Sequence, residues 1–164
     1  NADGSHVRVA VSAERWAHGG HHPNWWPDGE HVLMNLNTQG DGLRFARLAL
    51  DGSTCETLVP GIRGSGHPTL HPDGRYLLTD AYVDEPLAFG DGTAPIRLID
   101  LGNGTETQLV RIGIQPLAER STGALRVDPH PAWDRSHTRI AFNACPDGRR
   151  RVFVADLDDI LRDR

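Results

Sequence analysis

Residues 22–29 read HPNWWPDG, and residues 67–74 repeat the pattern as HPTLHPDG. A third and shorter copy, HPAWDR, stands at residues 130–135. The His-Pro pairs are 45 and then 63 residues apart, and each is followed by segments rich in strand-forming residues. Repeats of this length with one strand-rich unit per period are typical of propellers and solenoids. The repeat therefore predicts the fold, and it places one histidine of each copy at an equivalent position: His22, His67 and His130.

The segments after each His-Pro pair alternate in part between apolar and polar residues, and Asp-Gly or Asn-Gly turns separate them. This pattern is typical of antiparallel strands joined by tight turns. The sequence predicts an all-β fold, a β-propeller of which this chain covers about three four-stranded blades. We expect a short inner segment at 23–27 and strands at 31–36, 44–50, 55–59, 75–80, 95–101, 105–110, 138–143 and 151–157, followed by a helical tail at 158–164.

The whole chain, residues 1–164, is predicted to be a single propeller portion. Because the blades begin at the His-Pro pairs, we expect them at residues 22–66, 67–129 and 130–164, the last with a short C-terminal tail. Residues 1–21 are expected to hold the end of a preceding blade and a link. The reason is that Val7–Val11 is expected to form a strand after an Asp-Gly-Ser turn, as the segment at 55–59 is. The chain is therefore expected to be a piece of a larger propeller.

The second blade is longer than the first because of insertions at residues 83–94 and 113–127. Long loops on a repeat scaffold are often binding loops. An incomplete ring of blades also leaves two sheet edges open, and open edges attract other strands. We therefore expect the remaining propeller blades, or another chain, to cover them.

The composition narrows the function classes. The chain has 164 residues, 38% hydrophobic residues and a net charge of -5, values typical of a soluble globular domain. All 17 basic residues are scattered arginines and the balance is acidic, so nucleic acid is not an expected partner. No run of about 18 apolar residues occurs, so no membrane span is expected. Cys55 and Cys145 form no disulfide framework and leave the compartment, cytoplasm or periplasm, open.

The three equivalent histidines are the main functional signal. The innermost strand of every propeller blade lines the central channel, so equivalent positions on neighbouring blades converge there. Imidazoles together with a carboxylate suit divalent ions such as Zn, Mn, Fe or Ni. A residue before proline is expected to be extended, which would fix the direction of each histidine. Arg126 would place a guanidinium beside the cluster, where it could bind a carboxylate through two hydrogen bonds.

Structural interpretations of the same residues stay open. A histidine before proline at a blade entrance can be a turn residue whose ring bonds only to the backbone. Trp25, like Trp26 and Trp133, fits packing within a blade as well as a platform for a sugar ring. His21 and His71 are interpreted as exposed loop histidines. Asp80 and Asp100 are expected to bind backbone groups at the ends of strands.

The repeat unit, a Pro-Asp-Gly turn followed by strand, strand, turn and strand, resembles the blades of TolB-type (PD40 repeat) propellers. The histidines, with Pro72-Asp73-Gly74-Arg75, Thr79-Asp80 and Arg126-Val127-Asp128-Pro129-His130-Pro131, resemble the oligogalacturonate lyase group. The resemblance implies a propeller of about seven blades when intact. It also implies cleavage of uronate oligosaccharides by β-elimination, with a divalent metal at the mouth of the channel.

The same resemblance implies roles for single residues. His22 matches a histidine placed near the substrate, and His67 matches a metal-ligand histidine. The catalytic arginine of the group would lie upstream of residue 1. His130 matches the second histidine of a Gln-x-x-His-x-His ligand run, whose first histidine is Asp128 here. Leucine at position 125 replaces the glutamine of that run, and leucine cannot bind a metal. Mn²⁺ is the first expectation for the ion, with Zn²⁺ or Ca²⁺ as alternatives.

Uronate lyase chemistry needs two groups that this cluster could supply. A metal or an arginine neutralises the substrate carboxylate, and a histidine or tyrosine takes the proton from the neighbouring carbon. We therefore expect a polysaccharide lyase-like propeller that cleaves an acidic, uronate-containing oligosaccharide by metal-assisted β-elimination. His22 would be catalytic, Arg126 and Trp25 would bind substrate, and His67, His130 and Asp128 would hold the metal. The alternatives are a non-catalytic TolB-like binding propeller and the propeller domain of a peptidase.

Overall fold

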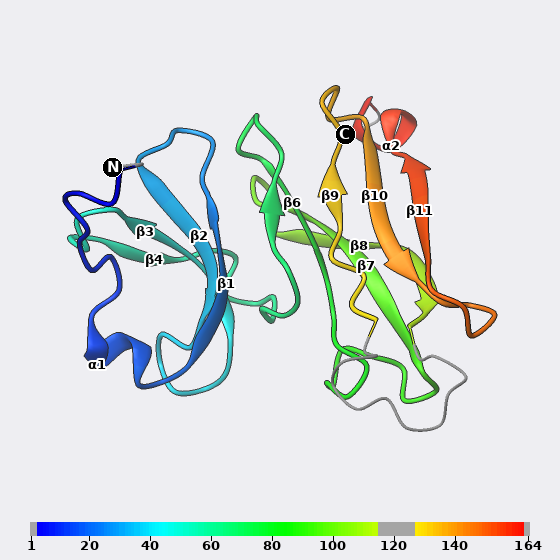
Figure 1. Cartoon of the computed structure of the whole chain (residues 1–164), viewed down its shortest axis with the longest axis horizontal. Coiled ribbons are helices and arrows are strands. Elements are labelled where there is room, and N and C mark those ends of the chain that lie inside the picture. Colours follow the sequence, from blue (N-terminus) through cyan, green and yellow to red (C-terminus); the bar gives the residue numbers. More distant parts are fainter. Residues whose placement is uncertain (1–2, 115–126, 163–164) are drawn as a thin grey trace.

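The computed structural model describes residues 3–114 and 127–162, which form three antiparallel sheets (Figure 1). In each sheet the strands pair in their order along the chain, which is the arrangement of a propeller blade. The all-β prediction is confirmed.

The first sheet contains β1 (Gly20–Trp25), β2 (His31–Leu36), β3 (Arg44–Ala49) and β4 (Cys55–Thr57). The second contains β5 (Thr69–Leu70), β6 (Tyr76–Asp80), β7 (Thr93–Asp100) and β8 (Thr105–Gly113). The third contains β9 (Ala132–Trp133), β10 (Arg139–Ala144) and β11 (Arg151–Asp156).

Two short helices flank the sheets. The expected C-terminal helix is present as α2 (Asp158–Arg162), and α1 (Ala13–Trp16) was not predicted. The strand expected at Val7–Val11 was wrong, because no strand of the described residues pairs with that segment and unpaired backbone groups do not form a strand. Instead Ser12 accepts a hydrogen bond from the backbone N–H of Arg15 and caps α1. Neither helix in the described part of the chain has the length and apolar character needed to span a bilayer.

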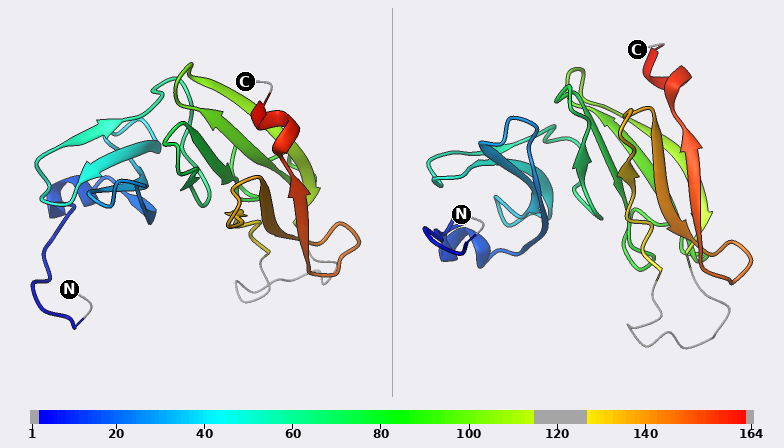
Figure 2. Two further views of the ribbon diagram at one scale, coloured as in Figure 1. Left: turned by 90° about the horizontal axis from the view of Figure 1, so that it is seen from above. Right: turned by 45° about the horizontal axis from the view of Figure 1, so that its top comes forward.

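The three sheets follow one another in an arc, with β1, β5 and β9 on its concave side (Figure 2). One apolar cluster joins the first and second sheets and contains Leu33, Phe45, Leu70, Leu77 and Ile99. A second cluster joins the second and third sheets and contains Leu78, Ile96, Ile140, Phe142 and Leu157. The neighbouring residues Leu77 and Leu78 of β6 point to opposite faces, as the period of a strand requires. The second sheet is therefore packed on both faces, and this packing joins neighbouring blades.

The third sheet has one face without a neighbour among the described residues. Phe153 and Ala155 of β11 pack toward the second sheet. The alternate residues Val152 and Val154 lie on the other face, and they are 70% and 68% exposed. In the first and second sheets, by contrast, the strand residues Met34, Leu77 and Leu78 are buried, either between blades or in a cluster that packs against Val11.

Candidate functional site

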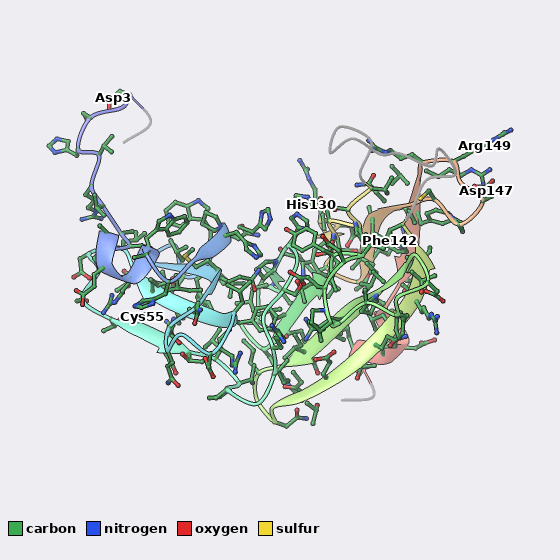
Figure 3. The ribbon with its side chains drawn as sticks, turned by 90° about the horizontal axis from the view of Figure 1, so that it is seen from below. Asp3, Cys55, His130, Phe142, Asp147 and Arg149 are labelled. Atoms are coloured by element: carbon green, nitrogen blue, oxygen red, sulfur yellow. The ribbon has the colours of Figure 1, made fainter. Side chains whose placement is uncertain are left out.

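The three histidines of the repeat come together on the concave side of the arc. His22 lies in β1, and His67 and His130 lie two residues before β5 and β9. The ring centroids of His22 and His67 are 4.1 Å apart, and those of His67 and His130 are 3.8 Å apart. Figure 3 marks His130 near the middle of the molecule, between Cys55 and Phe142. A cleft of about 290 Å³ runs along the three histidines and the residues that follow each: Pro23, Asn24, Pro68, Thr69, Pro131 and Ala132.

Asp80, the last residue of β6, supports two of these histidines from behind. Its fully buried carboxylate accepts the backbone N–H of His67 at 2.6 Å and that of His130 at 2.8 Å. Both carboxylate oxygens also lie 3.1 Å from Nδ1 of His67. The expectation that Asp80 binds backbone groups is confirmed, whereas its contact with the imidazole was missed. Because Asp80 holds Nδ1, the nitrogen of His67 left for a ligand is Nε2.

The backbone of the cluster differs from the expectation for residues before proline. His22 and His130 have φ angles of 54° and 48°, in the left-handed region, so the prediction that they are extended was wrong. In the second blade Gly66 takes the left-handed conformation instead, with φ of 63°. Side chains in this region strain the backbone, and such strain is concentrated at functional sites.

Two further side chains, those of Tyr82 and His21, join the cluster, and neither was predicted to belong to it. Tyr82, at the start of the loop between β6 and β7, places its Oη 2.5 Å from Nε2 of His22. The interpretation of His21 as an exposed loop residue was wrong. His21 is half-buried in β1, with its ring 4.7 Å from that of His22 and 6.0 Å from that of Tyr82. The only signal for Tyr82 in the sequence was its position beside the insertion at 83–94.

The loop that carries Tyr82 is attached to the scaffold by Glu85. The carboxylate of Glu85 accepts a hydrogen bond from the hydroxyl of Ser65, which is almost fully buried. The Glu85 charge raises the pKa of His21, but burial of that imidazole has the larger effect and the pKa is lowered on balance.

The environment favours neutral imidazoles. Burial, followed by the proximity of His67, His21 and His130, lowers the pKa of His22 to about 4. The pKa of His130 is also lowered: the residue is exposed, but the surrounding protein partly desolvates its ring and the stacked His67 ring adds to the effect. Neutral imidazoles can bind metal ions and accept protons.

The described residues do not form a complete metal site. Within residues 3–114 and 127–162, no group of three or more His, Cys, Asp or Glu side chains is arranged to hold an ion. The rings of His67 and His130 are stacked with an angle of 19° between their planes, so their nitrogen lone pairs do not point to one position. Asp128 is half-buried, and its backbone carbonyl accepts a hydrogen bond from Asn143. Arg126 and position 125 lie outside the described residues.

The tryptophans divide into two groups. Trp26 packs against the cluster between the first and second sheets, and Trp133 packs against the next cluster. Trp25, three residues after His22 in β1, is 62% exposed and does not pack within a blade. Its ring is therefore accessible to solvent, although Trp25 is not among the residues that line the histidine cleft.

A larger pocket, of about 710 Å³, lies elsewhere, between α1 and the first sheet. Its charged side chains, Glu14 and Arg15, are contributed by α1, and the single thiol on its wall belongs to Cys55, whose pKa is raised by burial. A protonated thiol is a poor nucleophile and a poor metal ligand. The histidine cleft is therefore the better candidate site, although it is smaller.

Solved structures share this arrangement of sheets. TolB from Acinetobacter baumannii matches 94% of this chain with a TM-score of 0.67 and 17% identity. An oligogalacturonate lyase in complex with manganese matches 87% with a TM-score of 0.65 and 17% identity. Oligogalacturonate lyase from Vibrio parahaemolyticus matches 95% with a TM-score of 0.67 and 19% identity. The chain therefore has the propeller fold of TolB and oligogalacturonate lyase.

The propeller is represented here only in part. The chain covers 33% of the TolB structure and 36% and 40% of the two lyase structures. No protein-family model and no curated protein sequence matches the chain. At 17–19% identity the likeness establishes the fold alone, because one fold can carry many functions.

Proposed function

We propose that this chain belongs to a lyase-like propeller that cleaves an acidic, uronate-containing oligosaccharide by β-elimination. The observation that carries the proposal is the cluster of His22, His67 and His130, whose rings line one cleft on the concave side of the blades. The likeness in fold to two oligogalacturonate lyases supports it.

The reaction requires that a proton be removed from the carbon next to the substrate carboxylate. His22 is the proposed base, because burial and its histidine neighbours keep it neutral and able to accept a proton. Arg126 is the proposed partner of the substrate carboxylate, since a guanidinium binds a carboxylate through two parallel hydrogen bonds. Trp25 is the proposed platform for a sugar ring, because its exposed ring follows His22 on the same strand.

Metal binding is a separate part of the proposal. His67, His130 and Asp128 are the proposed ligands of a divalent ion, with Mn²⁺ ahead of Zn²⁺ and Ca²⁺. In favour of His67 is its contact with Asp80, because ligating histidines commonly donate their other ring nitrogen to a carboxylate. Against a complete site are the stacked rings of His67 and His130. For that reason no step of the reaction is assigned to the ion.

The activity can be tested with the full-length protein and oligomers of several uronic acids. Elimination creates a carbon–carbon double bond conjugated to the carboxylate, so product appears as ultraviolet absorbance. We expect product with the wild type and with His18→Ala, an exposed histidine outside the cleft. His22→Ala is expected to lower the rate of product formation by about 100- to 10,000-fold and to leave a slow but measurable rate. The proposal fails if the folded wild type makes no product from any uronate oligomer, with or without added Mn²⁺.

A TolB-like binding function is the second candidate. It is favoured by the match to TolB, which is as close in fold as the matches to the lyases. In that case the histidines would have structural roles only, and replacing His67 and His130 with alanine would leave partner binding unchanged. A propeller domain of a peptidase remains an alternative, but no feature of the described residues favours it over these two.

A further inference from the structure

Tyr82 and His22 come from different blades and meet at one atom pair. Tyr82 follows β6 of the second sheet, and His22 lies in β1 of the first. Tyr82 Oη is 2.5 Å from His22 Nε2, within hydrogen-bond distance. This contact occupies one of the two ring nitrogens of His22, so only Nδ1 is left to react with a ligand in the cleft.

His67 is held in the opposite way. Its Nδ1 is the nitrogen bound to the Asp80 carboxylate, which leaves Nε2 for a ligand. The two neighbouring imidazoles, whose centroids are 4.1 Å apart, are therefore each held through one nitrogen, and within the described residues neither forms a hydrogen bond at the other. A hydrogen bond to one nitrogen decides which nitrogen of a neutral imidazole carries the proton.

We propose that Tyr82 is the positioning residue of His22: its hydroxyl oxygen accepts the Nε2–H and so leaves Nδ1 unprotonated as the basic atom. The inference rests on the lyase activity proposed above. In the step, His22 Nδ1 takes the proton from the carbon beside the carboxylate, and the electrons of that C–H bond form the new double bond. The bond from the neighbouring carbon to the leaving oxygen breaks, that oxygen takes a proton from water, and His22 returns its proton to the solvent. Tyr82 keeps its own proton throughout.

The surroundings hold the tyrosine ring in place for this role. The Tyr82 ring is half-buried, with its centroid 5.5 Å from that of His67 and 6.0 Å from that of His21. Three residues later, Glu85 binds the buried Ser65 and attaches the loop to the scaffold. The hydroxyl is therefore supplied by an anchored segment, as a group that orients a catalytic histidine must be.

The chain offers a matched control, because Tyr76 and Tyr82 are its only two tyrosines. Tyr76 lies in the same strand region, at the start of β6, and its buried hydroxyl has no hydrogen-bond partner among the described residues. Tyr82→Phe and Tyr76→Phe each remove one oxygen atom and keep the ring. The two variants therefore separate the hydrogen bond to His22 from a general effect of removing a hydroxyl.

The experiment compares full-length wild type, Tyr82→Phe and Tyr76→Phe on a uronate oligomer, each with and without His22→Ala. Tyr82→Phe is expected to lower kcat by about 10- to 100-fold, with KM within about 2-fold of wild type. Tyr76→Phe is expected to behave as wild type. In the His22→Ala background, Tyr82→Phe is expected to cause no further loss, because residues that act as one unit are not additive.

Nitrogen NMR of the imidazoles adds a readout that does not depend on activity. We expect wild-type His22 to show an unprotonated Nδ1 and a slowly exchanging Nε2 proton, and we expect that proton to exchange faster in Tyr82→Phe. An active wild type with an equally active Tyr82→Phe overturns the inference alone, as does a kcat loss of the same size in both His22 backgrounds. An inactive wild type overturns both the proposed lyase activity and the catalytic role of Tyr82 and His22. Unchanged His22 signals in Tyr82→Phe show that Tyr82 does not position the His22 ring.

Discussion

The Asp80 carboxylate binds both the backbone and the side chain of His67. It accepts the backbone N–H at 2.6 Å and lies 3.1 Å from Nδ1 of the ring. The same carboxylate accepts the backbone N–H of His130 from the next blade. The buried Asp80 at the end of β6 thus positions His67 and His130, with which the second and third blades begin. Changes that move Asp80 should disturb the cleft even if they lie outside it.

Gly66→Ala is the most direct way to move Asp80. A Cβ at position 66 would lie 2.2 Å from Oδ1 and 2.3 Å from the backbone oxygen of Asp80, so one of them must shift. We expect the free energy of unfolding to fall by about 3 kcal/mol. Gly90→Ala is the matched control, because Gly90 also has positive φ but nothing lies within 4 Å of the added atom. There we expect a loss of about 1 kcal/mol, from backbone strain alone. Urea unfolding measures both, and equal losses would contradict the contact with Asp80.

His130 and His67 occupy equivalent places in the repeat but differ in backbone conformation. His130 has φ of 48°, whereas His67 is not among the residues with positive φ. We expect His130→Gly to be more stable than His130→Ala by about 1 kcal/mol, because glycine adopts the left-handed region without strain. At His67 we expect the reverse order, by about 0.5–1 kcal/mol, because glycine loses more conformational entropy. The measurement is thermal or urea unfolding of the four variants. The same order at both positions would show that the backbone difference has no energetic effect.

Stability should depend on pH through the histidine cluster. The pKa values of His21, His22 and His130 are below the ordinary 6.5, with that of His22 at about 4. Between these values the unfolded chain binds more protons than the folded one, so the free energy of unfolding falls as pH is lowered from about 6.5 to 4. Above about pH 6.5 these histidines lower the free energy of unfolding by nothing, because they are neutral in both the folded and the unfolded chain. The check is urea unfolding across this range, in which His22→Gln should show a shallower decline than wild type. A parallel decline in both proteins would contradict the assignment to His22.

Metal binding can be measured without any activity. We expect Mn²⁺ and Zn²⁺ to bind weakly, because His67 and His130 are stacked and the ligand run has leucine at position 125. A His67→Ala/His130→Ala double variant should bind either ion more weakly still. His71→Ala serves as the control, because His71 lies outside the cleft and contacts Trp133. Calorimetric titration of all three proteins gives the result. Equal affinity of the wild type and the double variant would refute the proposed ligands.

We propose that the free face of the third sheet is covered in the complete assembly by remaining propeller blades or by another chain. Val152 and Val154 are exposed on that face, although strand residues of this kind are buried between the other sheets. Val152→Thr/Val154→Thr should therefore weaken self-association of the 164-residue chain without unfolding it. Sedimentation at several concentrations tests this, with the exposed Arg149→Gln as a control for net charge. A wild-type chain that stays monomeric at all concentrations would argue against another copy as the cover.

The strand order, the blade pattern and the equivalence of His22, His67 and His130 could all be predicted from the repeat in the sequence. These features follow from short-range rules, namely the alternation of side chains along a strand and the turn preference of Asp-Gly pairs. The rule for residues before proline is also local, but it failed at His22 and His130, where the surrounding structure holds the backbone in the left-handed region. The strand expected at Val7–Val11 failed for a related reason, since pairing needs a neighbour that local sequence does not supply.

The groups that surround the histidines could not be predicted from the sequence, because they are brought together by the packing of the blades. Tyr82 reaches His22 across 60 positions of sequence, and Asp80 reaches His130 across 50. Such contacts depend on the rotation of each blade relative to the next. Apolar packing between the sheets sets that rotation, and the contacting residues themselves do not. The same packing stacks His67 on His130 and so decides that three equivalent histidines do not by themselves make a metal site. Equivalent positions in a repeat are therefore visible in the sequence, while the direction in which each ring nitrogen points is set by the assembled blades.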